Sequence, residues 1–156
     1  MLKFITLFLS LSFTSIIFAD GHGMPKSGTF DFHTGWKCSV NVKTLGENHM
    51  QGAGDCTGVT FNDAGKGALH NGGGTCFVTF EVKDSVGYNS GVCNWSDQSG
   101  DMLYTSFTGN GVEGTNTITG GTGKYAGITG SGPWKCTDVG KAGENFCNQS
   151  LTYQLP

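Results

Sequence analysis

The first candidate for chemistry is the segment that follows residues 1–19. Those residues have the layout of a secretory signal peptide, because a positive charge precedes an apolar stretch that ends at the small residue Ala19. Cleavage there would start the mature chain at Asp20, Gly21 and His22. A free amine, two amide nitrogens and an imidazole in third position form a square-planar nitrogen set that suits Cu(II) or Ni(II). The sequence therefore contains a candidate metal site at the mature N-terminus, and the alternative is a disordered hydrophilic end.

Aromatic side chains are the second candidate. Trp36, Trp95 and Tyr104 lie in strand-like segments and are candidates for lining a ligand pocket. The alternative is that they belong to the core, where aromatic residues of small barrels are more often found. The histidines beyond residue 30 are scattered along the chain. Because a catalytic base, nucleophile and orienting acid must meet in space, we assign no catalytic residue from the sequence.

The cysteines form the third set, and all of them lie beyond the signal peptide. Their even number in an exported chain predicts disulfides, and their spacing is too long for the paired ligands of a zinc site. Six cysteines allow many pairings. Turn-rich residues lie midway between neighbouring cysteines, so sequential neighbours would face each other across hairpins. We therefore predict the pairs Cys38–Cys56, Cys76–Cys93 and Cys136–Cys147.

Short strands are the elements that must position these residues. Apolar and polar residues alternate with a period of two in the segments 36–43, 75–82 and 147–155. Shorter strand-like segments are 29–33, 56–61, 91–96, 102–108, 112–119 and 134–137. Many short strands separated by glycine turns predict an all-β protein, either an antiparallel barrel or a sandwich.

The composition excludes several other classes. Glycine accounts for 27 of the 156 residues, which disfavours long helices because glycine costs about 1 kcal/mol per helical position. Glycine does not recur at every third residue, so the chain is not collagen. The chain has 12 acidic and 9 basic residues and no arginine, so we expect no nucleic-acid partner. The sequence beyond the signal peptide shows no linker, charge block or low-complexity tail, which predicts one domain over residues 20–156. It also shows no second apolar run, so we expect no membrane span in the mature chain. The signal peptide predicts a secreted or periplasmic location.

Glycines are densest at residues 120–132. A phosphate-binding loop needs Ser or Thr after its Gly-Lys pair, but Tyr125 follows Lys124 here. No strand–helix unit surrounds the segment, which excludes a dinucleotide fingerprint. We expect a turn at residues 120–123 that leads into a strand in which Tyr125 and Gly127 share one face.

The segment 119–127 resembles the GGTGKYAG turn of the allene oxide cyclase–dirigent barrel superfamily. The segment 93–101 resembles the aspartate–glycine–aspartate hairpin that precedes this turn, and the likeness is strongest to small exported bacterial members, many without known activity. The resemblance implies a single antiparallel eight-stranded barrel that often self-associates. Some members of the superfamily cyclise or couple hydrophobic small molecules inside the barrel, so the resemblance also implies such an activity as an alternative.

We therefore expect a disulfide-stapled barrel that binds a hydrophobic small molecule or serves as a structural or interaction module, with a homo-oligomer as an additional expectation. The alternative is a cyclase-like enzyme that acts in the barrel cavity, and a weaker one is Cu(II) or Ni(II) binding at the N-terminus. We expect no other cofactor. An enzyme should have a cavity with convergent polar groups of perturbed pKa, whereas a structural module should have a filled interior.

Overall fold

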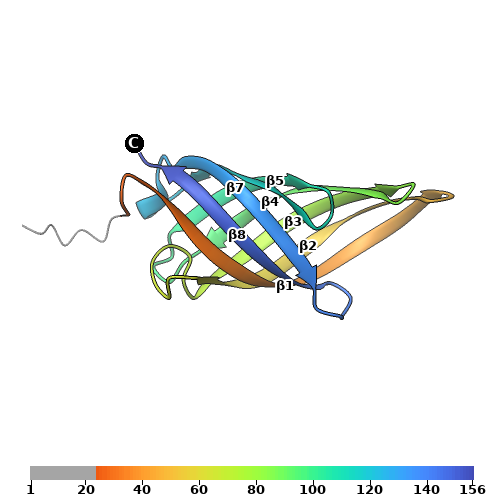
Figure 1. The fold of residues 1–156 in the computed structure, drawn as a ribbon, viewed down its shortest axis with the longest axis horizontal. Coiled ribbons are helices and arrows are strands. Elements are labelled where there is room, and N and C mark those ends of the chain that lie inside the picture. The colour runs from red at the N-terminus through yellow and green to blue at the C-terminus, as the bar shows by residue number, and fades with distance from the viewer. Residues whose placement is uncertain (1–23) are drawn as a thin grey trace, which may run out of the picture.

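The computed structural model describes residues 24–156, which form one closed barrel of eight antiparallel strands in chain order (Figure 1). The last strand pairs with the first, so the sheet has no free edge. Within this part of the chain, no helix has the length and apolar character needed to cross a membrane. The strands are β1 (Ser27–Gly46), β2 (His49–Asn62), β3 (Gly72–Lys83), β4 (Val86–Ser96), β5 (Met102–Gly109), β6 (Glu113–Gly121), β7 (Thr129–Asp138) and β8 (Glu144–Gln154).

The structure thus confirms the predicted barrel and excludes the alternative prediction of a sandwich. The signal peptide predicted at residues 1–19 and the metal site predicted at Asp20, Gly21 and His22 lie outside the described residues.

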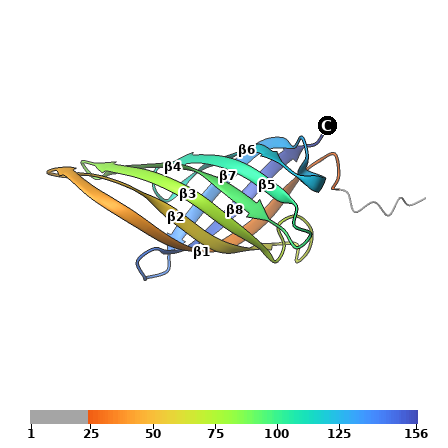
Figure 2. The same ribbon diagram turned by 180° about the vertical axis from the view of Figure 1, so that it is seen from behind.

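The first strand is longer than the sequence indicated. Segments 29–33 and 36–43 were expected as separate strands, but β1 runs through both without a break. The inward positions alternate regularly from Phe30 to Trp36, so the pattern continues across the glycine between the two segments. The hairpin between β1 and β2 and the one between β3 and β4 project beyond the other strands (Figures 1 and 2).

Hairpin turns lie where the sequence predicted them, and the three disulfides join the predicted partners. Each bridge links residues directly opposite each other in adjacent strands. Asp84 and Ser85 have φ values of 51° and 68°, which is the backbone of a tight hairpin turn. The bridges are Cys38–Cys56, Cys76–Cys93 and Cys136–Cys147.

The prediction of a strand directly after the glycine turn was wrong. Residues Gly123–Tyr125 form one turn of 3₁₀ helix, η1, and β7 begins only at Thr129. Gly123 and Gly127 have φ values of 53° and 74°, which lie in the left-handed region and interrupt extended backbone. The turn places the fully buried side chain of Tyr125 in the end of the barrel.

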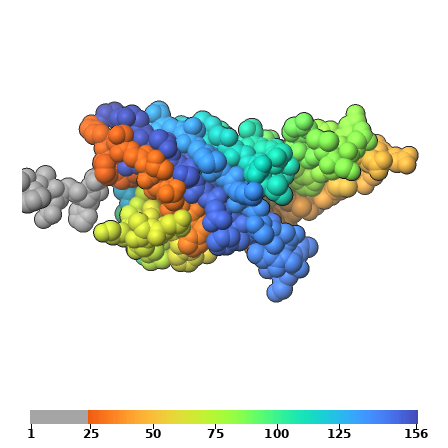
Figure 3. Space-filling model, viewed as in Figure 1, coloured from red at the N-terminus to blue at the C-terminus, as the bar shows by residue number. Residues whose placement is uncertain are grey.

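Loop 63–71, between β2 and β3, helps close the same end of the barrel. Its Leu69 side chain is 0% exposed, and its main chain is held by two buried side chains. The Thr60 hydroxyl donates to the Leu69 carbonyl at 2.6 Å, and the Asn62 amide donates to the Ala68 carbonyl at 2.8 Å. The space-filling view shows this loop, in yellow, at the end where the described chain begins and the C-terminus lies (Figure 3). The hairpin tips lie at the opposite end (Figure 1).

Candidate ligand cavity in the barrel

A cavity of about 400 Å³ occupies the interior of the barrel on the hairpin side. Each of the eight strands contributes to its wall, because every strand turns alternate side chains inward. The sulfur atoms of all three disulfides belong to residues of this wall. One inward residue per strand illustrates the ring: Trp36, Cys56, Cys76, Cys93, Phe107, Asn116, Trp134 and Cys147.

Two of the three aromatic residues predicted to bind ligand lie in this wall. Trp36 and Trp95 contact each other edge to face, with ring centroids 5.4 Å apart. Trp95 is 1% exposed, and its indole N–H donates to the Thr105 hydroxyl at 2.8 Å, so its polar atom is satisfied inside the barrel. Tyr104 does not line the cavity, because it lies between the buried residues Leu103 and Thr105 and therefore points outward.

Glycines in neighbouring strands make room for the large rings of the wall. Gly58 and Gly74 lie opposite each other in β2 and β3, beneath the indole of Trp36. Gly109 and Gly114 form an equivalent pair in β5 and β6, beneath the indole of Trp134. Many of the glycines that define the composition therefore serve close packing against cavity aromatics as well as turns.

A chain of three buried polar side chains crosses one side of the interior. The Asn116 amide donates to the Gln149 carbonyl oxygen at 2.8 Å, and the Gln149 amide donates to the Thr34 hydroxyl at 2.9 Å. All three residues are more than nine-tenths buried, and the two amides belong to the cavity wall. These amides give the cavity one side that can exchange hydrogen bonds with a ligand, and Asn89 and Asn145 are further neutral amides of the wall.

Charged side chains are absent from the cavity wall within the described residues. No Asp, Glu, Lys, Arg or His contributes to it, and its one titratable side chain is the exposed phenol of Tyr88. Nor do any three His, Cys, Asp or Glu side chains in residues 24–156 stand close enough together to hold a metal ion. The barrel is thus hollow, as an enzyme or a binding protein requires. The described wall of its cavity lacks the convergent ionisable groups that acid–base catalysis uses.

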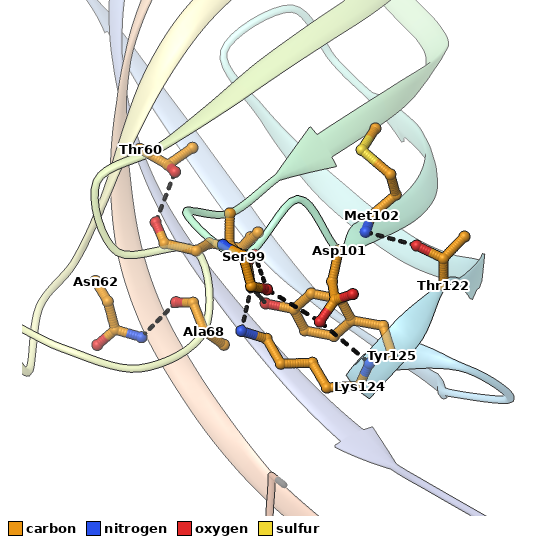
Figure 4. A network of polar contacts seen from close by, with 11 residues as sticks. Thr60, Asn62, Ala68, Ser99, Asp101, Met102, Thr122, Lys124 and Tyr125 are labelled. Carbon is orange, nitrogen blue, oxygen red and sulfur yellow. Dashed lines mark hydrogen bonds and ion pairs between the residues drawn. The ribbon is translucent and has the colours of Figure 1, made fainter. Parts of the chain in front are cut away.

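A buried cluster of ionisable side chains lies at the closed end, outside the cavity wall (Figure 4). The Asp97 carboxylate is 3% exposed and forms an ion pair with the ammonium of Lys124. It accepts hydrogen bonds from the Ser99 N–H at 2.9 Å, the Ser99 hydroxyl at 2.6 Å and the Tyr125 hydroxyl at 3.1 Å. Asp101 accepts from the Lys124 N–H at 3.3 Å and so ties the turn after β4 to η1.

The surroundings of Asp97 and Tyr125 fix their protonation states at neutral pH. Burial alone would raise the pKa of Asp97, but the hydrogen bonds from Lys124 and Ser99 outweigh it and hold the pKa below its ordinary value. Burial and the neighbouring Asp97 charge both raise the pKa of Tyr125. Asp97 is therefore a carboxylate that is fully engaged, and Tyr125 is a phenol that donates to it. This cluster links the turn after β4 to η1, and its buried carboxylate already has three partners.

Sequence reasoning missed the two buried amides of the wall, Asn116 and Gln149. Gln149 falls in the same alternating phase as Cys147 and Leu151, all of which point into the barrel. A polar residue in the apolar phase of a strand is the signal that could have identified it, since a buried amide requires a partner. Its partner could not be identified from the sequence, because Asn116 lies 33 residues away.

No family model and no curated protein matches the sequence. Among solved structures, the fold is similar to that of the pterocarpan synthase dirigent protein GePTS1, with a TM-score of 0.53 and 13% sequence identity. The match covers 97% of this chain and 100% of that one. The chain therefore has a dirigent-like barrel fold.

Proposed function

We propose that this protein is an exported barrel that binds an uncharged, largely apolar small molecule in its cavity. A volume of about 400 Å³ falls in the range of small-molecule sites. The observation that carries the proposal is the wall itself, which combines aromatic rings, aliphatic side chains and disulfides with no charged side chain among the described residues. The dirigent-like fold is consistent with a ligand-binding barrel.

The absence of charge from the described wall favours a neutral ligand. An ionised group that enters a cavity without a counter-charge loses its hydration, and nothing in the wall compensates that loss. Asn116 and Gln149 offer neutral amides on one side of the cavity. The ligand class that fits is an apolar molecule with one neutral hydrogen-bonding group, such as a carbonyl or a hydroxyl.

The same composition favours binding over acid–base catalysis. A general acid or base must reach the reacting atoms, and its pKa works best near the pH of reaction. The Asp97 carboxylate is engaged with Lys124, Ser99 and Tyr125 at the closed end. The one titratable side chain of the described cavity wall, the phenol of Tyr88, lies at the rim of the cavity and is 64% exposed to solvent.

Binding can be tested with N-phenyl-1-naphthylamine, a neutral apolar dye whose fluorescence rises in apolar surroundings. We expect saturable binding to the wild-type protein and its loss in Val78→Trp, because Val78 lines the cavity and an indole there would fill it. Thr79→Trp is the matched control, since Thr79 is the exposed neighbour in the same strand. Equal dye binding by both variants would place the dye outside the cavity and refute the proposal.

Export is supported by the three disulfides, which persist in oxidising compartments. The intact mass of the protein recovered outside the cytoplasm tests it. A mature chain that begins at Asp20 is the expected result, and a full-length intracellular chain with free thiols is the result that contradicts it.

A further inference from the structure

Four of the six cysteines form one continuous row across the cavity wall. In the strand register, Cys38 lies opposite Cys56, Cys56 lies opposite Cys76, and Cys76 lies opposite Cys93. All four line the cavity. The two disulfides of the row therefore stand side by side, and Cys56 and Cys76 are directly opposed but not bonded to each other.

The spacing of antiparallel strands brings this unbonded pair within bonding reach. The bonded pairs have Cα–Cα distances of 4.0 and 4.1 Å, which identifies them as the narrow pairs of the sheet. A residue in a narrow pair with one neighbouring strand forms a wide, hydrogen-bonded pair with the other, where the Cα atoms are about 5.5 Å apart. Cys56 and Cys76 form such a wide pair. That separation lies inside the range that disulfides span.

We propose that this row is a thiol–disulfide exchange site that captures a small thiol covalently. The incoming thiolate attacks Sγ of Cys38, which forms a mixed disulfide and releases Cys56 as a thiolate. The Cys56 thiolate then attacks Sγ of Cys76, which forms the Cys56–Cys76 disulfide and releases Cys93. Cys93 takes up the proton that the incoming thiol lost. Two disulfides exist before and after the reaction, so it needs no oxidant or reductant.

The entry point and the size limit follow from the wall. Cys38 is partly exposed, whereas the other three cysteines of the row are buried, so an external thiol meets Cys38 first. The thiol must enter a cavity of about 400 Å³, which restricts it to low-molecular-weight compounds.

The second exchange is what would retain the captured thiol. A mixed disulfide is normally lost again when the thiolate released in the first step attacks it. Here the released Cys56 thiolate forms a disulfide with Cys76 instead. The thiol left free is that of Cys93, which lies three strands away from Cys38. The third disulfide provides an internal comparison, because Cys147 is opposed on its other side by Thr34. A thiol that opens this bridge has no neighbouring disulfide to complete the exchange.

Peptide mapping of the wild-type protein tests the proposal directly. The folded protein is incubated with a few equivalents of 2-mercaptoethanol, quenched in acid, unfolded in N-ethylmaleimide and digested with trypsin without reduction. Lysines separate all six cysteines, at positions that include Lys43, Lys66, Lys83 and Lys141. The expected products are a mercaptoethanol adduct on Cys38, a Cys56–Cys76 crosslink, and maleimide on Cys93. Maleimide on Cys56 without the crosslink, or reaction confined to Cys136–Cys147, would overturn the proposal.

The double variant Cys76→Ala/Cys93→Ala removes the second disulfide and keeps the first. After free thiol is removed, its Cys38 adduct should be lost as the Cys38–Cys56 bond re-forms, whereas the wild-type adduct persists. Equal persistence in both proteins would contradict the exchange. If the variant does not fold, the crosslink in the wild-type protein decides the question by itself, and dye binding in the cavity is measured independently of either result.

Discussion

Gly74 lies directly beneath the indole of Trp36. A Cβ atom at residue 74 would stand 2.8 Å from Cη2 of Trp36 and 3.1 Å from the ring of Trp95. Real Cβ atoms do not approach ring carbons that closely, so any larger residue must displace one of the two indoles. The identity of residue 74 therefore controls the position of both tryptophans in the cavity wall.

Gly74→Ala should destabilise the protein by about 1–3 kcal/mol, the usual effect of adding a methyl group at a tightly packed position. It should also weaken binding of N-phenyl-1-naphthylamine, because both indoles that residue 74 contacts line the cavity. Urea unfolding and dye titration measure the two effects. Gly35→Ala is the control, since a Cβ there would meet no atom within 4 Å and its stability should be unchanged or slightly higher. Equal stability of the two variants would show that Gly74 does not limit the packing.

Lys124→Met should destabilise the protein by about 3 kcal/mol, because it leaves the buried Asp97 carboxylate without its cation. Lys124 holds the pKa of Asp97 low, so the stability that the carboxylate contributes is present above its ordinary pKa and is lost as pH falls through the lowered one. In the variant, Asp97 can be buried as a neutral acid at low pH. Urea unfolding at several pH values should therefore show the difference from wild type narrowing as the pH falls.

Lys135→Met is the matched control for this prediction, because Lys135 and Glu113 form an exposed pair at 3.4 Å. Exposed pairs contribute about 0–1 kcal/mol. A loss of stability in Lys135→Met as large as that in Lys124→Met would mean that burial of the Asp97 pair is not the cause.

Period-two alternation predicted much of the strand content, although the pattern divided β1 into two segments, and turn residues midway between cysteines predicted the disulfides. Both signals are local, because a strand and a hairpin turn are encoded by neighbouring residues. The strand predicted through Tyr125 failed for a reason that is not local. Tyr125 turns inward because its hydroxyl has a partner in Asp97, which lies 28 residues earlier in the chain.

For the candidate site too, local signals could be predicted from the sequence and non-local ones could not. Trp36 and Trp95 could be predicted, since large aromatic residues in the inward phase of strands face a barrel interior. Tyr104 was predicted with them from residue type alone, and its place between two inward residues directs it outward. The hollow interior could not be predicted, because it depends on how glycines and rings from all eight strands fit together.

Tyr125→Phe should make the protein less sensitive to alkaline pH than the wild type. Burial raises the pKa of Tyr125 in the folded state, so above about pH 10 the unfolded chain loses a proton that the folded chain keeps. Folding stability therefore falls as pH rises above the unfolded value. Urea unfolding at several pH values from 8 upward should show a smaller decline in the variant. At pH 7 the variant should be less stable by about 1–2 kcal/mol, since the hydrogen bond to the Asp97 carboxylate is lost. A decline identical in the two proteins would mean that Tyr125 ionises as easily folded as unfolded.

Gln149→Leu and Asn116→Leu test the buried amide chain of the cavity. Gln149→Leu removes the partner of both Asn116 and Thr34, and leaving buried polar groups unpaired should destabilise the protein by about 1–3 kcal/mol. In the double variant, Asn116 is no longer present to be left unpaired. The double variant should therefore lose less stability than the sum of the two single variants, because the two amides are coupled. A double-mutant cycle from urea unfolding measures this coupling. Strict additivity would show that the bond between the two amides contributes nothing to stability, and the hydrogen bond from Gln149 to Thr34 would then be the part of the chain that holds Gln149 in place.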